Sequence, residues 1–281
     1  MTNDTALQEK AQRLRDEIRS LGSVLVAFSG GVDSTLLLRV AVDELGDNAI
    51  AATARSETYP EEEYRRSREL AEAIGAEQIV FETSELGIEG FANNPPDRCY
   101  FCKMELFGNL KEIAGERGLN AVLHGAQCDD LGDHRPGMRA AKELEVKAPL
   151  LRAGLSKEDV RELSRALGLP TWDQPAMACL SSRFPYGERI TEEKLIRVGG
   201  AERFLRGLGL RQVRVRHHGN IARIEVSANN LGTLTRPDVR AQVVARLKEL
   251  GFIYITLDLQ GFRSGSMNEP LKADGHESGR D

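Results

Sequence analysis

The sequence lacks any long hydrophobic run. No stretch approaches the roughly 20 consecutive apolar residues that a helix needs to cross a bilayer. The first twenty residues are charged and contain no apolar segment of the kind found in secretory signals. We therefore expect a cytoplasmic protein with no membrane partner.

The sequence also lacks an excess of basic residues. Its 281 residues include 38 Lys and Arg against 43 Asp and Glu, which gives a formal net charge of −5. Proteins whose main partner is nucleic acid usually carry a basic excess, because neutralised phosphates supply most of the non-specific affinity. The charge balance argues against a nucleic-acid partner and leaves open only a local basic patch.

Cysteine is scarce as well. Four cysteines in a chain of this length are too few for a disulfide framework. In a reducing compartment, such cysteines are more often metal ligands or reactive thiols. The four positions are Cys99, Cys102, Cys128 and Cys179.

Short apolar runs alternate with helical patterns over the first 170 residues. Hydrophobic residues make up 41% of the chain, enough to bury a core. The alternation predicts an α/β fold, with a parallel sheet and helices on both faces. The expected helices cover 5–21, 33–45, 61–74 and 101–117, and the expected strands cover 23–28, 48–54, 78–81 and 120–125, with 145–151 as a candidate fifth strand. A further helix begins at a capping box of Ser156 and Asp159 and ends near Gly168 and Pro170.

The pattern changes after Pro185. A helix over 191–208 precedes two strands, 212–217 and 221–226, joined by a Gly219-Asn220 turn. A helix over 237–250 and a strand over 252–257 follow. We expect a main domain over 1–185, a small α+β domain over 186–263 and a disordered polar tail over 264–281.

The strongest local motif is the run Ser29-Gly30-Gly31-Val32-Asp33-Ser34, which follows an apolar strand and opens a helix. Paired glycines let the backbone approach a phosphate, and the helix N-terminus adds partial positive charge. Ser29 and Ser34 can donate hydroxyl hydrogen bonds. Asp33 would repel a phosphate without a cation between them, which makes it a candidate Mg²⁺ ligand. The plainer alternative is a glycine turn that only packs a helix on the sheet.

This loop is neither a Walker loop nor a GxGxxG motif. It resembles the loop of the ATP pyrophosphatase (PP-loop) enzymes, which cleave ATP between the α and β phosphates and adenylate a substrate. The resemblance implies a Rossmann-like fold with ATP at the carboxyl ends of the strands. It also implies that the strand end from Ala52 to Arg55 lies near the adenine.

Two of the cysteines form a Cys99-x-x-Cys102 pair where a loop meets a helix. A helix N-terminus lowers a thiol pKa and favours metal ligation. With Cys179, three thiolates would leave one position of a four-iron cluster open. A structural zinc site is the alternative, with Cys128 or a histidine as the fourth ligand. Cys128 has no sequence partner, and we expect it to be a packed thiol.

Taken together, the motifs resemble those of the LarE-type sulfur transferases over roughly residues 10–262. The matching segments are SGGVDS at 29–34, SETYP at 56–60, DRCYFCK at 97–103, HGAQCDDLGDHRPG at 124–137, the stretch 172–187 around Cys179, and VRVRHHG at 213–219. The resemblance implies a substrate, a pyridinium dicarboxylate mononucleotide. Its carboxylates become thiocarboxylates on the way to a nickel-pincer nucleotide. It also implies a homo-oligomer, for which the family suggests a hexamer.

Family members differ in their sulfur source. Some sacrifice the sulfur of the cysteine that matches Cys179, which becomes dehydroalanine. Others use a 4Fe-4S cluster on three cysteines. Since this chain has all three, the resemblance favours a cluster on Cys99, Cys102 and Cys179, with Cys179 central in either mode.

The resemblance also assigns substrate-binding residues in the second domain. Arg214 and Arg216 share one face of a strand and suit a phosphate, with Glu202 and Glu225 nearby as candidate metal ligands. From spacing alone, a solvated charged face is an equal alternative. Arg183 would contact AMP or the substrate, or else is an ordinary loop arginine.

The resemblance places Gly125 and Asp130 in the nucleotide site. Asp129, Asp130 and Asp133 form an acidic loop whose role in Mg²⁺ or substrate binding competes with helix capping and with simple solvation.

Two other functions remain as alternatives. A tRNA thiolase can combine a PP-loop with a CxxC and a third cysteine, but it should carry an extended basic surface. A non-catalytic nucleotide-binding module would leave Asp33 and the cysteines without a purpose. The whole pattern favours an ATP- and Mg²⁺-dependent sulfur transferase.

Overall fold

The chain folds into two compact units. The computed structural model describes residues 2–132, 136–175, 178–263 and 265–269. The first unit comprises Met1–Phe91 and Asp97–Met177, and the second comprises Ala92–Pro96 and Ala178–Asp281. Each unit has its own sheet, so each is described separately below.

The first unit is built on a parallel sheet of four strands. They are β1 (Val24–Ala27), β2 (Ala49–Arg55), β3 (Gln78–Glu82) and β4 (Ala121–Leu123), in the order β3-β2-β1-β4. All neighbouring pairs are parallel. Val24, Leu25 and Val26 of the central strand are completely buried, as expected where helices cover both faces. The predicted α/β class is confirmed.

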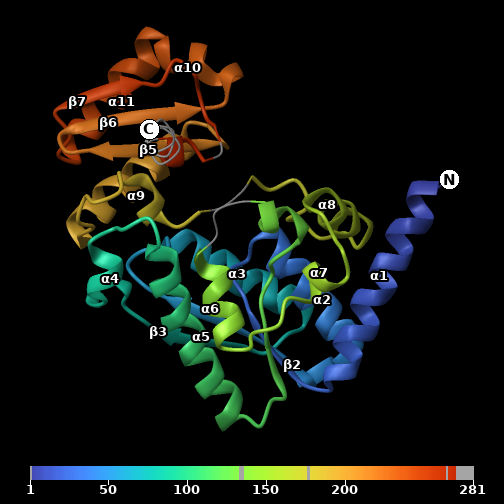
Figure 1. Ribbon diagram of the computed structural model, residues 1–281. Coiled ribbons are helices and arrows are strands. Elements are labelled where there is room, and N and C mark those ends of the chain that lie inside the picture. The colour runs from blue at the N-terminus through green and yellow to red at the C-terminus, as the bar shows by residue number, and fades with distance from the viewer. Residues whose placement is uncertain (1, 133–135, 176–177, 264, 270–281) are drawn as a thin grey trace, which may run out of the picture. The chain divides into compact units, whose positions relative to one another are not determined.

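Helices cover the two faces of this sheet (Figure 1). Val24 and Val26 of β1 pack in a core with Leu14, Ile18 and Leu36, while Leu25 packs in a second core with Phe107 and Leu110. This division follows the two-residue period of a strand. The helices are α1 (Thr2–Leu21), α2 (Val32–Leu45), α3 (Glu61–Ile74), α4 (Glu89–Ala92), α5 (Arg98–Glu116), α6 (Pro136–Glu143), α7 (Pro149–Arg152) and α8 (Lys157–Ala166).

The candidate fifth strand over 145–151 is wrong. Glu145 has a left-handed φ of 54°, which a strand does not tolerate, and Pro149 begins the short helix α7. Between them the chain makes an isolated parallel bridge from Lys147 to Leu123. The segment Val146–Leu151 therefore pairs with the edge strand β4 at Lys147 alone and does not form a fifth strand.

The second unit contains a three-stranded sheet in the order β5-β6-β7. β5 (Val213–His218) and β6 (Ile221–Val226) form the predicted hairpin, with Gly219 at φ 59°, and β7 (Tyr254–Leu257) pairs parallel to β6. The helices of this unit are α9 (Glu192–Gly207), α10 (Leu231–Thr235) and α11 (Pro237–Glu249). The predicted α+β character is confirmed.

A short stretch from earlier in the chain completes the second unit. The Asn94 side-chain amide donates to the carbonyls of Phe184 and Pro185, and its own carbonyl accepts from the N–H of Gly187. No sequence pattern indicates this exchange. Within the predicted tail, Ser266–Asn268 form a 3₁₀ turn, and Ser266 is buried; residues 264 and 270–281 lie outside the described residues. None of the described helices is long and apolar enough to span a membrane.

Candidate functional site

The glycine loop joins β1 to α2 at the carboxyl end of the central strand. Gly30 has φ 68°, and a Cβ there would lie 3.3 Å from the backbone of Ser67, so both conformation and space favour glycine. Gly31 caps α2 without a side-chain hydrogen bond. The N–H groups of the first helical turn are thus left for an anion rather than for a capping side chain.

A second glycine brings the end of β4 against this loop. A Cβ at Gly125 would lie 3.1 Å from both the Asp33 Cβ and the Ser34 nitrogen. Only a residue without a side chain permits such an approach. The structure therefore places Gly125, predicted as a nucleotide residue, directly beside the start of α2.

Asp33 has two differently placed oxygens. Its Oδ2 lies 2.5 Å from Nζ of Lys157, the first residue of α8. Its Oδ1 is buried and has no hydrogen-bond partner. A buried carboxylate oxygen without a partner is costly, and a cation would satisfy it. The carboxylate thus fits the predicted role as a Mg²⁺ ligand.

Tyr59 links the 56–60 segment to the glycine loop. Its hydroxyl donates to the carbonyl oxygen of Ser29 at 2.8 Å. Burial and the nearby Glu63 carboxylate raise the pKa of Tyr59, so the phenol remains a donor. Within the loop, the Ser34 hydroxyl lies 3.3 Å from that of Ser29 and donates to the Gly31 carbonyl. Both predicted serines therefore lie in one hydrogen-bonded turn.

The residues predicted near the adenine lie along β2. Ala52 is buried, and its carbonyl accepts from the N–H of Phe28 at the end of β1. Arg55 is exposed at the last position of the strand, where it pairs with Glu61 and Glu82. Nothing in these contacts brings Arg55 to the glycine loop, and its nucleotide role remains a prediction.

Asp130 is buried in the turn that follows β4. Its Oδ2 accepts from the N–H of Gln127, while the neighbouring Asp129 accepts from the N–H of Lys157. Both carboxylates therefore cap backbone N–H groups, which is one of the roles that the sequence left open. Asp133 lies outside the described residues.

The cysteine pair lies on the first turn and a half of α5. Cys99 is exposed and Cys102 is half-buried, and a three-residue spacing puts them on one face of the helix. The Cys102 thiol lies 3.8 Å from Oε1 of Glu85, whose other oxygen accepts from Thr58. Cys128 is half-buried, and its thiol contacts the Leu151 carbonyl, which fits a packed thiol.

Cys179 is exposed and lies in the second unit, just before the 3₁₀ turn Leu180–Arg183. The Arg183 guanidinium donates to the carbonyls of Ala178 and Cys179. Arg183 is almost fully buried and forms a two-point ion pair with Glu202. The Cys179 thiol therefore lies on a turn whose backbone is held in place by the buried Arg183–Glu202 ion pair.

The strand arginines are buried, which rules out the solvated-face alternative. Arg216 donates to Glu225, to Ser266 and to the carbonyl of Ser182. The pKa of Arg214 is lowered to about 10, first by burial and then by the charge of Arg183. Close to these groups lie the basic residues Arg183, Arg206, Arg214, Arg216 and Arg223, and the acidic residues Glu202 and Glu225.

Glu202 is held as a carboxylate. Burial alone would raise its pKa, but the charge of Arg183 and its hydrogen bonds outweigh burial and lower the pKa. The N–H of Val215 donates to the same carboxylate. Asp258 also pairs with Arg223, so five basic groups face three carboxylates, and the surplus of positive charge suits an anion such as a phosphate.

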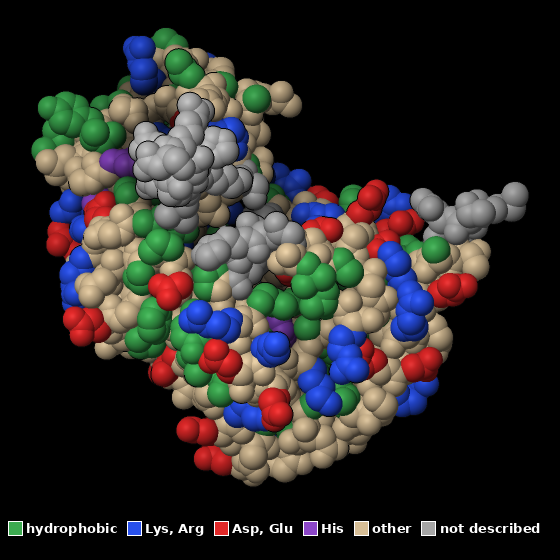
Figure 2. Space-filling view, in the orientation of Figure 1, with side chains coloured by type: hydrophobic (Ala, Val, Ile, Leu, Met, Phe, Trp, Pro, Cys, Tyr) green, Lys and Arg blue, Asp and Glu red, His purple; other side chains and the backbone are tan. Residues whose placement is uncertain are grey.

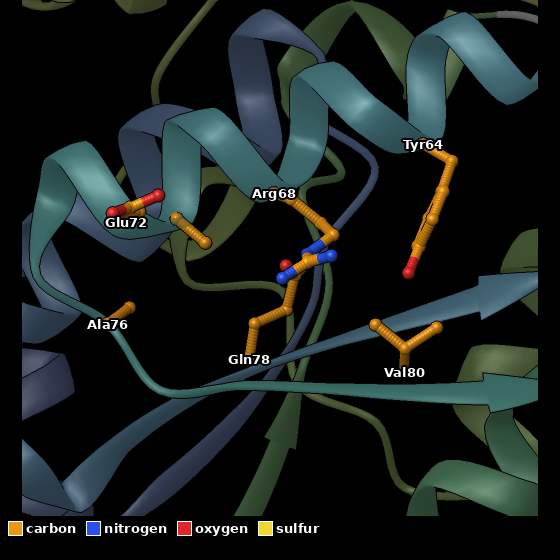
Figure 3. Close-up of a pocket in the computed structure, with 7 residues that line it drawn as sticks. Tyr64, Arg68, Glu72, Ala76, Gln78 and Val80 are labelled. Atoms are coloured by element: carbon orange, nitrogen blue, oxygen red, sulfur yellow. The ribbon is translucent and has the colours of Figure 1, made fainter.

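A separate pocket lies between α3 and the edge strand β3 (Figure 3). Its volume is about 490 Å³, and side chains from both elements point into it. The lining residues are Tyr64, Arg68, Ala71, Glu72, Ala76, Gln78 and Val80. None of the residues predicted from sequence lines this pocket, so it is not the candidate site.

Several contacts of the site were not predicted from sequence. Lys157 and Tyr59 touch the loop, Glu85 touches Cys102, and Ser266 touches Arg216. The capping box at Ser156 marked where α8 begins but not what the next side chain would meet. Among the described residues, no group of three or more His, Cys, Asp or Glu side chains lies close enough to hold a metal ion.

A glycine loop at the carboxyl end of the central strand, opening a helix, defines the class: the chain has the Rossmann-like fold of the PP-loop ATP pyrophosphatases. The chain is 28% identical over 161 residues to argininosuccinate synthase of Haloarcula marismortui. This match covers 53% of this chain and 38% of the relative. No protein-family model matches the chain.

Two relatives match over nearly the whole length. An uncharacterised protein of Synechocystis sp. is 46% identical over 265 residues, which is 94% of this chain and 99% of the relative. The pyridinium-3,5-bisthiocarboxylic acid mononucleotide synthase of Lactiplantibacillus plantarum is 42% identical over 266 residues, 94% of this chain and 96% of the relative. The chain belongs to the LarE family and is an enzyme of the sulfur transferase type.

Proposed function

We propose that the enzyme uses ATP to activate a carboxylate of pyridinium-3,5-biscarboxylic acid mononucleotide and then replaces a carboxylate oxygen by sulfur. The observation that carries this proposal is the exposed thiol of Cys179 on a turn fixed by the buried Arg183–Glu202 pair. The full-length similarity to a synthase of this name supports the choice of substrate.

The first step follows from the chemistry of a carboxylate, which is a poor electrophile because oxide would have to leave. A substrate carboxylate oxygen attacks the α-phosphorus of ATP, the bond to the bridging oxygen breaks, and pyrophosphate leaves. The N–H groups of Gly30 to Ser34 and the start of α2 would hold the phosphates. Asp33 would hold Mg²⁺, which neutralises phosphate charge, through its buried Oδ1.

In the second step a sulfur nucleophile attacks the acyl carbon and AMP leaves. The exposed thiols of Cys99 and Cys179, with Cys102, have the donor chemistry for a 4Fe-4S cluster. When bound by three cysteines, such a cluster has one iron free to carry an extra sulfide. Its three ligands would be Cys99, Cys102 and Cys179.

The alternative sulfur source is Cys179 itself. Its Sγ would attack the acyl adenylate to form a thioester and release AMP. Loss of the Cys179 Cα proton and cleavage of the Cβ–Sγ bond would then leave the thiocarboxylate and dehydroalanine. Both modes need the same exposed position, so the position of the thiol supports both.

The arginine cluster suits the phosphate of the mononucleotide. Burial, and after it the charge of Arg183, lowers the pKa of Arg214, and a dianion placed beside it would favour the charged guanidinium. Arg214 and Arg216 would bind the phosphate, and Glu225 keeps Arg216 in place through a 2.7 Å ion pair. A metal role for Glu202 has less support, since Arg183, Arg206 and the Val215 N–H already occupy its carboxylate.

A homo-oligomer is part of the proposal. Ile253, Tyr254 and Leu259 are large apolar side chains exposed just before, in and just after β7, and such groups often mark subunit contacts. Light scattering on the purified protein tests this, and a monomer at all concentrations would contradict it.

A tRNA substrate has less support, because acidic and basic side chains are interspersed on the visible face of the first unit (Figure 2).

Anaerobic purification followed by iron and sulfide assays tests the sulfur source. The protein is then incubated with the pyridinium substrate and MgATP and weighed by mass spectrometry. An intact chain with thiolated product supports the cluster. Loss of H₂S at Cys179 supports Cys179 as the sulfur donor. Absence of any thiolated product contradicts the proposed function.

A further inference from the structure

We propose that residues 265–269 form a strap over the arginine cluster of the second unit, and that the Ser266 hydroxyl occupies Arg216 until a substrate phosphate displaces it. This inference rests on the proposed binding of the mononucleotide phosphate by Arg214 and Arg216. It adds a gate to that site, made of a segment that composition alone assigns to a disordered tail.

The strand arginines are buried too deeply for a phosphate to reach them as they stand. Arg214 is 7% exposed and Arg216 is 5% exposed. To bind, a phosphate oxygen must come within about 2.9 Å of a guanidinium nitrogen. The Nε of Arg216 is buried and has no hydrogen-bond partner among the described residues, so this guanidinium keeps a donor for a ligand. Binding therefore requires that a group covering Arg216 moves away.

Of the groups that accept hydrogen bonds from Arg216, two are held in place by the fold. Arg216 donates to the Ser182 carbonyl at 2.9 Å and to Glu225 at 2.7 Å. The Ser182 carbonyl belongs to the turn that Arg183 fixes, and Glu225 is fully buried in β6. The third acceptor is the Ser266 hydroxyl at 3.1 Å. Since Ser266 belongs to neither the turn nor the sheet, it is the group that can leave.

The strap is held by polar contacts rather than by a hydrophobic core. Of its five residues, only Ser266 is buried. The Tyr186 hydroxyl donates to the Asn268 side chain at 2.8 Å, and Arg223 contacts the Met267 sulfur at 3.7 Å. Segments with few buried apolar contacts open at low cost in free energy. The strap therefore has the kind of attachment that a gate needs.

The chain that leads to the strap is anchored beside the arginines. Gly261 has φ 70°, and a Cβ there would lie 2.8 Å from the Val226 carbonyl oxygen. The N–H of Phe262 donates to the same carbonyl, and the Phe262 ring centre lies 5.4 Å from the Arg214 guanidinium. The strap can therefore open while the chain before it stays on the arginine cluster.

The Ser266 hydroxyl offers Arg216 the same kind of group that a phosphate would. It donates its one proton to Glu225 at 3.2 Å, so it presents a lone pair to Arg216. A hydrogen bond between two charged groups is roughly twice as strong as one between neutral groups. A phosphomonoester dianion is therefore able to displace the hydroxyl, whereas an uncharged ligand is not.

The test measures binding of ribose 5-phosphate and of the pyridinium mononucleotide to the full-length protein by calorimetry. Ser266→Ala removes the competing hydroxyl and should tighten binding of both ligands about 2- to 10-fold, the value of one hydrogen bond. Asn268→Ala removes the bond between the strap and Tyr186 and should tighten binding about 2- to 5-fold. Asn229→Ala, at an exposed position of the same unit, should match the wild type. Binding of MgATP should change less than about twofold in all three variants.

Hydrogen exchange distinguishes a strap that opens from one that closes on the substrate. The Asn268 N–H donates to the Gly265 carbonyl oxygen at 2.8 Å, which protects it from exchange. Saturating ribose 5-phosphate should speed exchange of this amide, while the amides of the β5–β6 hairpin should exchange no faster. Slower exchange of the Asn268 amide with ligand would mean that the strap closes on the phosphate, and the proposal would be wrong.

The binding data decide the remaining outcomes. Weaker binding by Ser266→Ala would mean that the hydroxyl is a phosphate ligand, and unchanged binding in both strap variants would mean that the strap does not limit access. Either result overturns this inference and leaves the proposed function standing. If Ser266→Ala does not fold, Asn268→Ala and the exchange of its neighbours are judged by the same criteria. If neither the wild type nor a strap variant binds either ligand, the phosphate site of the proposed function is overturned together with this inference.

Discussion

Arg183 and Glu202 form a two-point ion pair inside the second unit, with Nε 2.6 Å from Oε1 and Nη2 3.0 Å from Oε2. The same guanidinium donates to the carbonyl of Cys179, so one buried residue connects the fold of this unit to the exposed thiol. This arrangement makes Arg183 important for stability as well as for the position of Cys179.

Replacing Arg183 by alanine should destabilise the protein by about 3–5 kcal/mol, because it leaves the Glu202 carboxylate buried without its main partner. Urea unfolding followed by fluorescence measures the change. The matched control is Arg246→Ala, which removes an exposed pair with Glu249 and should cost less than about 1 kcal/mol. Equal losses in the two variants would contradict a structural role for the buried pair.

Replacing Cys179 by alanine should abolish transfer of sulfur while substrate-dependent pyrophosphate release continues. The thiol acts after adenylation in both proposed modes, so only the second step should be lost. Pyrophosphate and thiolated product are measured in the same reaction. Cys128→Ala, which removes a half-buried thiol, should keep both steps. Normal product formation by Cys179→Ala would exclude both sulfur sources.

Replacing Asp33 by alanine should reduce pyrophosphate release about 100-fold or more, as expected when charge stabilisation of the reacting phosphates is lost. The rate is followed with a coupled pyrophosphate assay at several Mg²⁺ concentrations. Asp47→Asn changes an exposed carboxylate beyond the other end of α2 and serves as the control. An Asp33→Ala enzyme with an unchanged rate and unchanged Mg²⁺ dependence would rule out the metal role.

Replacing Tyr59 by phenylalanine should raise the KM for ATP about fivefold, because a hydrogen bond to the Ser29 carbonyl worth about 1 kcal/mol is lost. Steady-state kinetics with varied ATP give this value. Tyr254→Phe, at an exposed position of β7, should leave the KM unchanged. If Tyr59→Phe behaves like this control, the hydroxyl does not hold the loop in its binding conformation.

His124 should make stability depend on pH. Burial, with a smaller effect from Lys103, lowers its pKa to about 4 from an ordinary value of 6.5. The unfolded chain therefore takes up a proton below pH 6.5, while the folded protein does so only near pH 4, and the stabilisation is lost as the pH falls between these values. From pH 7 to pH 5 the loss should be about 2 kcal/mol. His124→Gln should remove that part of the pH dependence in urea unfolding, and an unaltered pH profile would contradict the assignment.

The parts of the fold that depend on local chemistry could be predicted from sequence. The glycine loop needs a left-handed residue at Gly30, and the helix at Ser156 needs its capping box, so both leave a direct signature. The structure of the segment from Val146 to Leu151 could not be predicted in this way. Its apolar residues fit a strand, but Glu145 and Pro149 bend the chain out of the sheet.

Contacts between segments far apart in the chain could not be predicted from the sequence. The partners of Asp33 and Arg183 lie 124 and 19 residues away, and no spacing rule relates them. The burial of Arg214 and Arg216 depends on what packs over the hairpin, which alternation along one strand does not reveal. Family resemblance singled out these residues as candidates, and the structure shows which groups they pair with.

The most direct test of the account is the balance of products in one anaerobic reaction of the full-length enzyme with MgATP and pyridinium-3,5-biscarboxylic acid mononucleotide. We predict that pyrophosphate, AMP and thiocarboxylate form in equal amounts and only when the pyridinium substrate is present. Hydrolysis of ATP to ADP, or thiocarboxylate formed without pyrophosphate, would contradict adenylation at the glycine loop.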